Sequence, residues 1–162
     1  MSASAPDLDP EEWLLRRLPP YQPLQPLIDG RVRPSSAAFS PSSAGGGISF
    51  NREATLRQHG RPLWEGCPEE TWAVAAIKVR DLVGLGLEVR LTPPPPHHAE
   101  AFGIAAKGPA QEKRIRKRIA EIARIAVWPG RIETWPPTDI APPTVQPRLV
   151  AQNTSAPRPM IP

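Results

Sequence analysis

Hydrophobic and polar positions recur along the chain with two periods, one typical of helices and one typical of strands. Four apolar residues recur at a spacing of three or four and would share one helix face: Trp72, Ala76, Val79 and Val83. Pro68 and two acids precede this stripe, as at a helix start, and Gly84 follows it. The pattern predicts a helix from about Pro68 to Gly84.

Two more segments have helical spacing. Between Gly108–Pro109 and Pro129–Gly130, the apolar positions form a single stripe: Ile115, Ile119, Ile122 and Ala126. This stripe predicts a second long helix over about Pro109–Trp128. Pro10–Leu18 opens with proline and acids and closes with arginines, which favours a short amphipathic helix that docks on another surface.

Other segments follow the two-residue alternation of half-buried strands. Leu87–Leu91 alternates cleanly, and Ile48–Asn51 does so after a glycine run. Arg31–Arg33 and Ala37–Ser40 are weaker strand candidates, and Arg52–His59 favours a helical turn. Together these elements predict an α+β fold in which a small antiparallel or mixed sheet packs with two main helices.

The distribution of proline divides the chain into a central domain and two proline-rich ends. Of its 24 prolines, seven fall within residues 1–34 and nine within 129–162. Because proline fixes φ and donates no backbone hydrogen bond, these ends are poor in regular structure. We therefore predict a proline-rich arm over 1–27 with one short helix, an α+β domain over 28–132, and a largely disordered tail over 133–162. Pro19–Pro26 favours a stiff polyproline II linker.

The composition indicates the source of the protein, its location in the cell and the chemistry open to its cysteine. Arginine outnumbers lysine 16 to 4 beside abundant alanine and proline, which is typical of a GC-rich bacterial genome. Acids occupy the start of the chain, and no apolar run approaches the roughly 20 residues of a membrane span, so we expect a cytoplasmic protein without a membrane partner. Cys67 is the only cysteine, which excludes an internal disulfide and a cysteine-cluster metal site; we expect no disulfide-linked partner.

Positive charge concentrates on the second predicted helix. Six cations occupy one twelve-residue segment, opposed within it by Glu121 alone: Lys113, Arg114, Arg116, Lys117, Arg118 and Arg124. The whole chain has a net charge of +4, so the remainder is close to neutral. A local basic patch attracts an acidic protein or a nucleic acid, although a solvated helix face has the same composition. No aromatic residues interleave with the cations, so base-specific readout is not predicted.

A second candidate site is His97–Glu100, where imidazole lies beside carboxylate as acid–base chemistry requires. Capping or loop histidines give the same pattern. His59 is the only other histidine, and a metal ion usually needs three or four ligands, so no metal site is predicted. Gly45–Gly47 lacks the Gly-Lys-Ser/Thr of a phosphate loop, and no cofactor is predicted.

The order of Gly30–Arg33, Ile48–Phe50 and Glu53 loosely resembles the arginine, serine and glutamate order of ADP-ribosyltransferases. The resemblance covers about 25 residues. It implies that Arg31 or Arg33 would hold an NAD phosphate, Ser49 would support the nicotinamide ribose pocket, and Glu53 would polarise the ribose. The chain departs from the family in lacking its Ser-Thr-Ser strand and its Glu-x-Glu or Gln-x-Glu motif, and Glu53 follows Ser49 too closely.

These features leave three hypotheses. The first is a small bacterial interaction or accessory protein that binds a partner, most simply a protein, through the basic helix and the proline-rich arms. The second is a small enzyme or toxin-like effector whose weak catalytic candidates are Arg31, Arg33, Ser49, His98 and Glu100. The third is a sequence-nonspecific nucleic-acid binder. We favour the first because it needs no chemistry beyond what the residues show.

Overall fold

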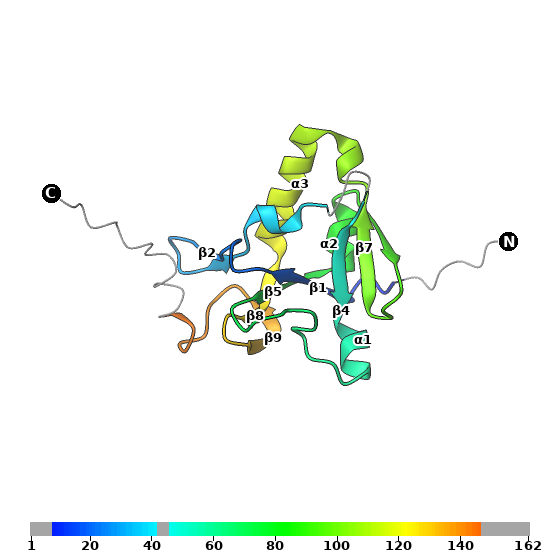
Figure 1. Cartoon of the computed structure of the whole chain (residues 1–162). Helices are drawn as coiled ribbons and strands as arrows, with labels where there is room; N and C mark the ends of the chain where they lie inside the picture. The colour runs from blue at the N-terminus through cyan, green and yellow to red at the C-terminus, as the bar shows by residue number, and fades with distance from the viewer. Residues whose placement is uncertain (1–7, 42–45, 147–162) are drawn as a thin grey trace.

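A computed structural model describes residues 8–41 and 46–146, and within them one antiparallel sheet of seven strands dominates (Figure 1). The strand order across the sheet is β6-β7-β4-β1-β5-β8-β9. The strands are β1 (Trp13–Leu18), β4 (Ile48–Arg52), β5 (Ala73–Lys78), β6 (Glu88–Leu91), β7 (His98–Phe102), β8 (Arg124–Trp128) and β9 (Ile132–Thr138). β1, the first strand of the described residues, lies at the centre of the sheet between β4 and β5.

Short helices and a separate two-stranded hairpin surround this sheet. The helices are α1 (Glu53–Gln58), α2 (Val79–Gly84) and α3 (Pro109–Ile122), with 3-10 turns η1 (Ser36–Phe39) and η2 (Ala105–Lys107). The hairpin consists of β2 (Gln25–Pro26) and β3 (Val32–Arg33). The antiparallel sheet with helices packed on it confirms the predicted α+β class.

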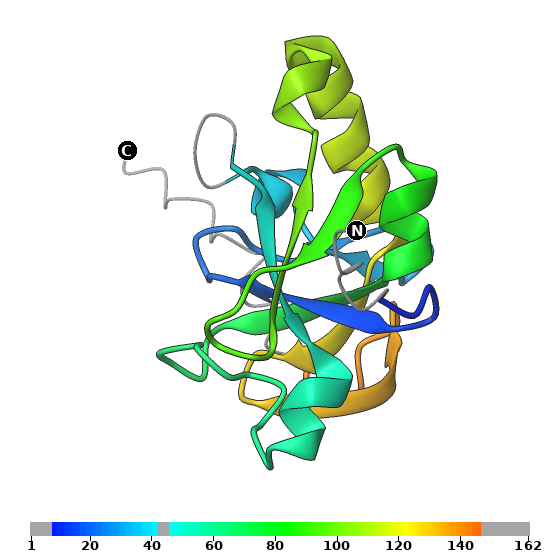
Figure 2. The same ribbon diagram turned by 90° about the vertical axis from the view of Figure 1, so that its right-hand side faces the viewer.

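The sheet has two faces with separate cores. On one face Leu14 and Leu18 of β1 pack in the larger cluster, which α3, η1 and α2 cover with residues such as Ile119 and Phe39. On the other face Leu15 packs in a smaller cluster with Leu56 of α1 and with the loop that follows it. Figure 2 shows α3 and α1 at opposite ends of the sheet.

The predicted helix over Pro10–Leu18 is wrong, because Trp13–Leu18 forms β1. The leucines of this segment fit a helical stripe, but they also fit a central strand that is buried on both faces. In the strand, Leu14, Leu15 and Leu18 are all buried, and backbone pairing with β5 runs the whole length from Trp13 to Leu18. A single isolated helix of this length would be marginal in water, so tertiary pairing decides the conformation.

The predicted helix over Pro68–Gly84 is wrong in its first part. Ala73–Lys78 forms β5, and only Val79–Gly84 is helical, as α2. Every residue of Ala73–Ile77 is buried, so the strand shows no alternation, and a continuous apolar run does not distinguish a strand from a helix. The predicted helix Pro109–Trp128 begins correctly but ends at Ile122, since Arg124–Trp128 forms the buried strand β8.

Most predictions from alternating segments are confirmed. Leu87–Leu91 and Ile48–Asn51 are confirmed as β6 and β4, and the helical turn over Arg52–His59 is confirmed as α1. Val32–Arg33 forms the short strand β3, whereas Ala37–Ser40, predicted as a strand, belongs to the 3-10 turn η1. Ser35 caps this turn by accepting a hydrogen bond from the Ala37 backbone N–H, which favours the helical conformation.

The sheet extends past both predicted domain limits. β1 precedes residue 28, and β9 continues to Thr138, beyond residue 132. Leu24, in the segment predicted to be a linker, is buried in the larger core. Ala141 and Val145, in the segment predicted to be a disordered tail, are buried there as well. Residues 147–162 lie outside the described part of the chain. Among residues 8–41 and 46–146, no helix has the length and apolarity needed to cross a bilayer.

Candidate functional site

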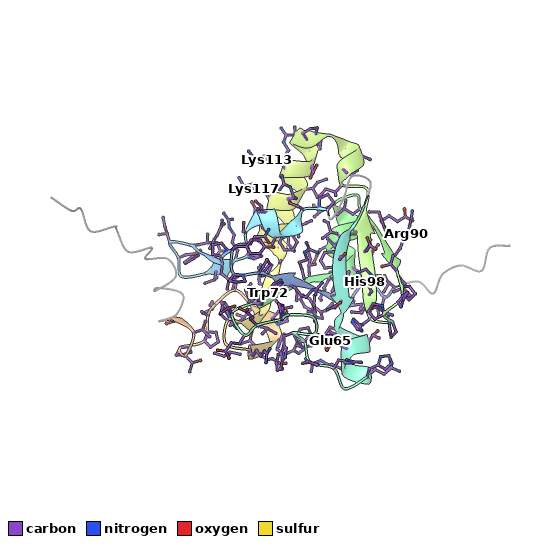
Figure 3. All side chains as sticks on the ribbon, viewed as in Figure 1. Glu65, Trp72, Arg90, His98, Lys113 and Lys117 are labelled. Carbon is purple, nitrogen blue, oxygen red and sulfur yellow. The ribbon has the colours of Figure 1, made fainter. Side chains whose placement is uncertain are left out.

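Four cations form a basic track along the exposed side of α3: Lys113, Arg114, Lys117 and Arg118. They recur at a spacing of four, so they stack one turn apart, and Figure 3 shows Lys113 and Lys117 one below the other on the same side of the helix. Lys113, Arg114 and Lys117 have no ion-pair partner among the described residues. From Lys113 to Arg118 the track therefore presents positive charge over a little more than one helical turn, or about 7 to 8 Å.

The two other predicted cations of this segment lie elsewhere. Arg116 is half-buried against η1, where its Nη1 donates to Ser40 Oγ over 3.2 Å and its Nε lies 3.9 Å from Glu112. Arg124 follows α3, and its Nη1 donates to the carbonyl oxygens of residues 121, 122 and 123. A cation at this place satisfies the open carbonyls and the negative end of the helix dipole.

The track ends in a hollow of about 290 Å³ that we call the arginine pocket. It is formed where the C-terminal end of α3 meets the β2–β3 hairpin and the chain after β9 (Figure 1). The lining side chains include four arginines and two acids: Arg31, Arg33, Arg118, Arg124, Glu121 and Asp139. The structure thus brings together two groups of predicted site residues, Arg31 and Arg33 from the hairpin and Arg118 and Arg124 from the basic segment.

Ion pairs hold three of these arginines in place. Arg31 Nε lies 2.6 Å from Asp29, Arg118 Nη1 3.1 Å from Glu121, and Arg124 Nε 3.7 Å from Asp139. The backbone N–H of Arg31, followed by its guanidinium, keeps the pKa of Asp29 below its usual value. Arg33 has no carboxylate partner within the described residues. The pocket keeps a net positive charge, centred on Arg33.

Exposed aliphatic side chains stand beside the pocket. Ile28 is fully exposed at the turn of the β2–β3 hairpin, next to the lining residue Leu27. Ile140 is 59% exposed and directly follows the lining residue Asp139. Single exposed apolar side chains are common on protein surfaces, and here they add apolar area beside a charged hollow.

The remaining predicted catalytic residues share a different surface, which we call the polar strand face. Ser49 of β4 pairs with Glu100 of β7, and Asn51 pairs with His98, so all four side chains lie on one side of the two strands. This is the face that carries Leu15 and α1, because Leu15 pairs with Asn51. Ser49, His98 and Glu100 therefore converge, whereas Arg31 and Arg33 do not join them.

His98 has a defined orientation on this face. Its Nδ1 lies 3.0 Å from the carbonyl oxygen of Thr92 and 2.7 Å from Thr92 Oγ1. A hydrogen bond to the carbonyl oxygen requires a proton on Nδ1, whereas the Thr92 hydroxyl can donate or accept and fits either tautomer. No hydrogen bond joins the side chains of Ser49, His98 and Glu100 among the described residues, and the strands therefore present these groups without a nucleophile–base pair.

The arginine, serine and glutamate order does not build a common site. Arg31 and Arg33 line the arginine pocket, Ser49 lies on β4, and Glu53 begins α1, where it pairs with Arg57. β3 belongs to the separate hairpin rather than to the sheet that contains β4. Within the described chain, no cluster of three or more histidine, cysteine or acidic side chains could hold a metal ion.

The sequence did not point to the acids and aliphatic residues of this site. Glu121 and Asp139 orient arginines from the end of α3 and from beyond β9, and Ile28 and Ile140 stand in turns. Residues so far apart in the chain meet only through the fold. The one feature of the sequence that could have indicated these residues is that two isolated isoleucines, Ile28 and Ile140, each lie next to an aspartate in a stretch without periodicity.

Comparisons of the chain with protein-family models, with curated proteins and with solved structures gave no match.

Proposed function

We propose that this chain is a non-catalytic interaction protein that binds an acidic segment of another protein along the basic track and in the arginine pocket. The observation that carries the proposal is that the basic track runs directly into the arginine pocket. The track has cations without ion-pair partners among the described residues, and the pocket contains Arg33, which also has none there. Ile28 and Ile140 flank the pocket. Guanidinium groups recognise carboxylates through two parallel hydrogen bonds, and apolar neighbours supply burial.

The surroundings of the pocket favour a protein partner over a nucleic acid. The residues that line the pocket include no aromatic ring on which a base could stack. Ile28 and Ile140 instead suit aliphatic side chains of a peptide.

The proline-rich arms contribute less to this proposal than the helix does. Pro19 and Leu24 are buried, so the segment after β1 packs on its own domain. Residues 147–162 lie outside the described chain and carry no part of the argument. We place the interaction in a bacterial cytoplasm, where a thiol such as that of Cys67, which is free and buried, stays reduced.

Binding of a short synthetic peptide of alternating glutamate and leucine, measured by titration calorimetry on the full chain, tests the proposal. Arg33→Glu should weaken binding about ten- to a hundredfold, because it removes a charged hydrogen bond worth about 1.5–3 kcal/mol. Lys113→Glu with Lys117→Glu should weaken it as well, and added salt should weaken every variant that binds.

Arg61→Glu is the matched control, since Arg61 is an exposed arginine after α1 that pairs with Glu65. It should leave peptide binding unchanged. Ile28→Ser should weaken binding of the glutamate–leucine peptide but not of an all-glutamate peptide. The proposal fails if a glutamine–leucine peptide binds equally well, if no peptide binds, or if duplex DNA binds more tightly through the same cations.

A further inference from the structure

A second hollow, of about 230 Å³, lies at the C-terminal end of β1, and we call it the twin-arginine hollow. Its lining consists of two arginines, two aromatic residues, a proline and a glutamine: Arg16, Arg17, Tyr21, Trp72, Pro19 and Gln22. β1 pairs with β4 only through Leu14 and Leu15, so the two strands separate at this point. The lining contains no carboxylate, unlike that of the arginine pocket.

Arg16 is half-buried in the gap between the strands without a counter-ion. Its Nε donates to the carbonyl oxygen of Ala38 over 2.8 Å, and its Nη1 donates to that of Ser49 over 2.9 Å. Its other N–H donors have no partner among the described residues. Burial, together with the charge of Arg17, lowers the pKa of Arg16, which reflects the cost of a cation held away from water and anions.

Arg17 leaves β1 on the face opposite to Arg16, as successive strand residues do, and adds a second cation to the lining of the hollow at the end of the strand. Its described hydrogen bond runs from Nη1 to the carbonyl oxygen of Gly66 over 2.9 Å, and it too has no ion pair within the described chain. Gly66 has a positive φ of 84°, and a Cβ there would lie 2.5 Å from Arg17 Nη1. A glycine at this position thus lets the loop approach the guanidinium and fix it.

Aromatic rings line the rest of the hollow. Tyr21 is 78% exposed, and Trp72, at the centre of the view in Figure 3, is half-buried at the start of β5. An exposed ring face offers a surface on which a planar group can stack. The two guanidinium groups, which have no ion-pair partner in the described chain, suit an anion, and the two rings suit a planar group. A ligand that carries both would therefore fit the hollow.

We infer that the twin-arginine hollow binds a small phosphorylated ligand with a planar base, in the class of the nucleoside monophosphates. Arg16 and Arg17 hold the phosphate, and Tyr21 and Trp72 contact the base. The volume of about 230 Å³ lies below the roughly 300–1,000 Å³ of sites that enclose drug-sized ligands, so the hollow would hold part of a mononucleotide and leave the rest in solvent. This site is separate from the arginine pocket and does not depend on the proposed function.

Titration of the full chain with adenosine monophosphate, adenosine and inorganic phosphate, followed by calorimetry, tests the inference. Adenosine monophosphate should bind more tightly than either part alone. Arg17→Gln should weaken adenosine monophosphate at least tenfold and leave adenosine unchanged, since it removes a phosphate contact. Tyr21→Ala should weaken adenosine monophosphate and adenosine but not inorganic phosphate.

These two variants carry the test because both side chains are exposed, whereas Arg16 joins β1 to β4 and its loss could unfold the protein. Arg33→Ala, in the arginine pocket, is the matched control and should bind adenosine monophosphate as the parent chain does. In return, Arg17→Gln should bind the acidic peptide normally, so the two proposals can fail separately. The inference is overturned if adenosine monophosphate does not bind saturably, or if Arg33→Ala weakens it as much as Arg17→Gln.

Discussion

Cys67 belongs to the loop that follows α1, and its thiol is buried in the smaller core with Leu56 and Leu63. Burial raises the pKa of Cys67 to about 11, against a much weaker opposing effect of nearby arginines. The thiolate is the reactive form of cysteine, so this group is protonated at neutral pH and is unsuited to nucleophilic work. Its position before Pro68 in the sequence does not make it reactive.

Thiol labelling checks this assignment. At pH 8, Cys67 in the folded chain should react about a hundredfold more slowly than in urea, because a pKa near 11 in place of about 9 leaves a hundredfold less thiolate. A raised folded-state pKa also stabilises the fold fully below the unfolded-state value, and this contribution declines as the pH rises toward 11. Equal labelling rates in buffer and in urea would contradict the burial of Cys67.

At the scale of elements, α3 has one buried face and one exposed, cationic face. Ile119 is fully buried in the larger core, whereas Lys113 and Lys117 point away from it. Ile119→Ala should lower the free energy of unfolding by about 2–5 kcal/mol, since the cavity it leaves cannot be filled completely. Urea unfolding measures this loss, and the folded fraction should still bind the acidic peptide.

Val83→Ala is the control for that substitution. Val83 of α2 is 54% exposed although the sequence placed it on a core stripe. Its replacement should change the free energy of unfolding by no more than about 0.5 kcal/mol. A large loss at Val83, or none at Ile119, would show that the helices do not pack as described.

Elements with strict alternation or clear end signals were predictable from the sequence, as β4, β6 and the start of α3 demonstrate. β1, β5 and β8 were not, because strands buried on both faces lose the alternation that identifies strands. The arginine pocket and the twin-arginine hollow were likewise not predictable from the sequence as complete sites. The basic segment was evident, but only strand order and loop contacts bring Arg33 to Arg118 and Arg16 to Trp72.

At the scale of the whole molecule, the first and last described strands hold the sheet together. A fragment of residues 28–132 lacks β1, which pairs with both β4 and β5, and also lacks most of β9. We expect this fragment to show no cooperative thermal unfolding by circular dichroism, whereas residues 8–146 should unfold cooperatively. Cooperative unfolding of the shorter fragment would mean that the sheet tolerates the loss of its central strand.

The place of β1 also has a consequence during synthesis. Trp13–Leu18 leaves the ribosome before its longest pairing partner, Ala73–Lys78, which is made 60 residues later. At about 5–20 residues per second, the strand waits roughly 3–12 s with its leucines uncovered. A nascent chain in this state offers an apolar segment to chaperones or to other chains, so the yield of folded protein should depend on how fast it is translated.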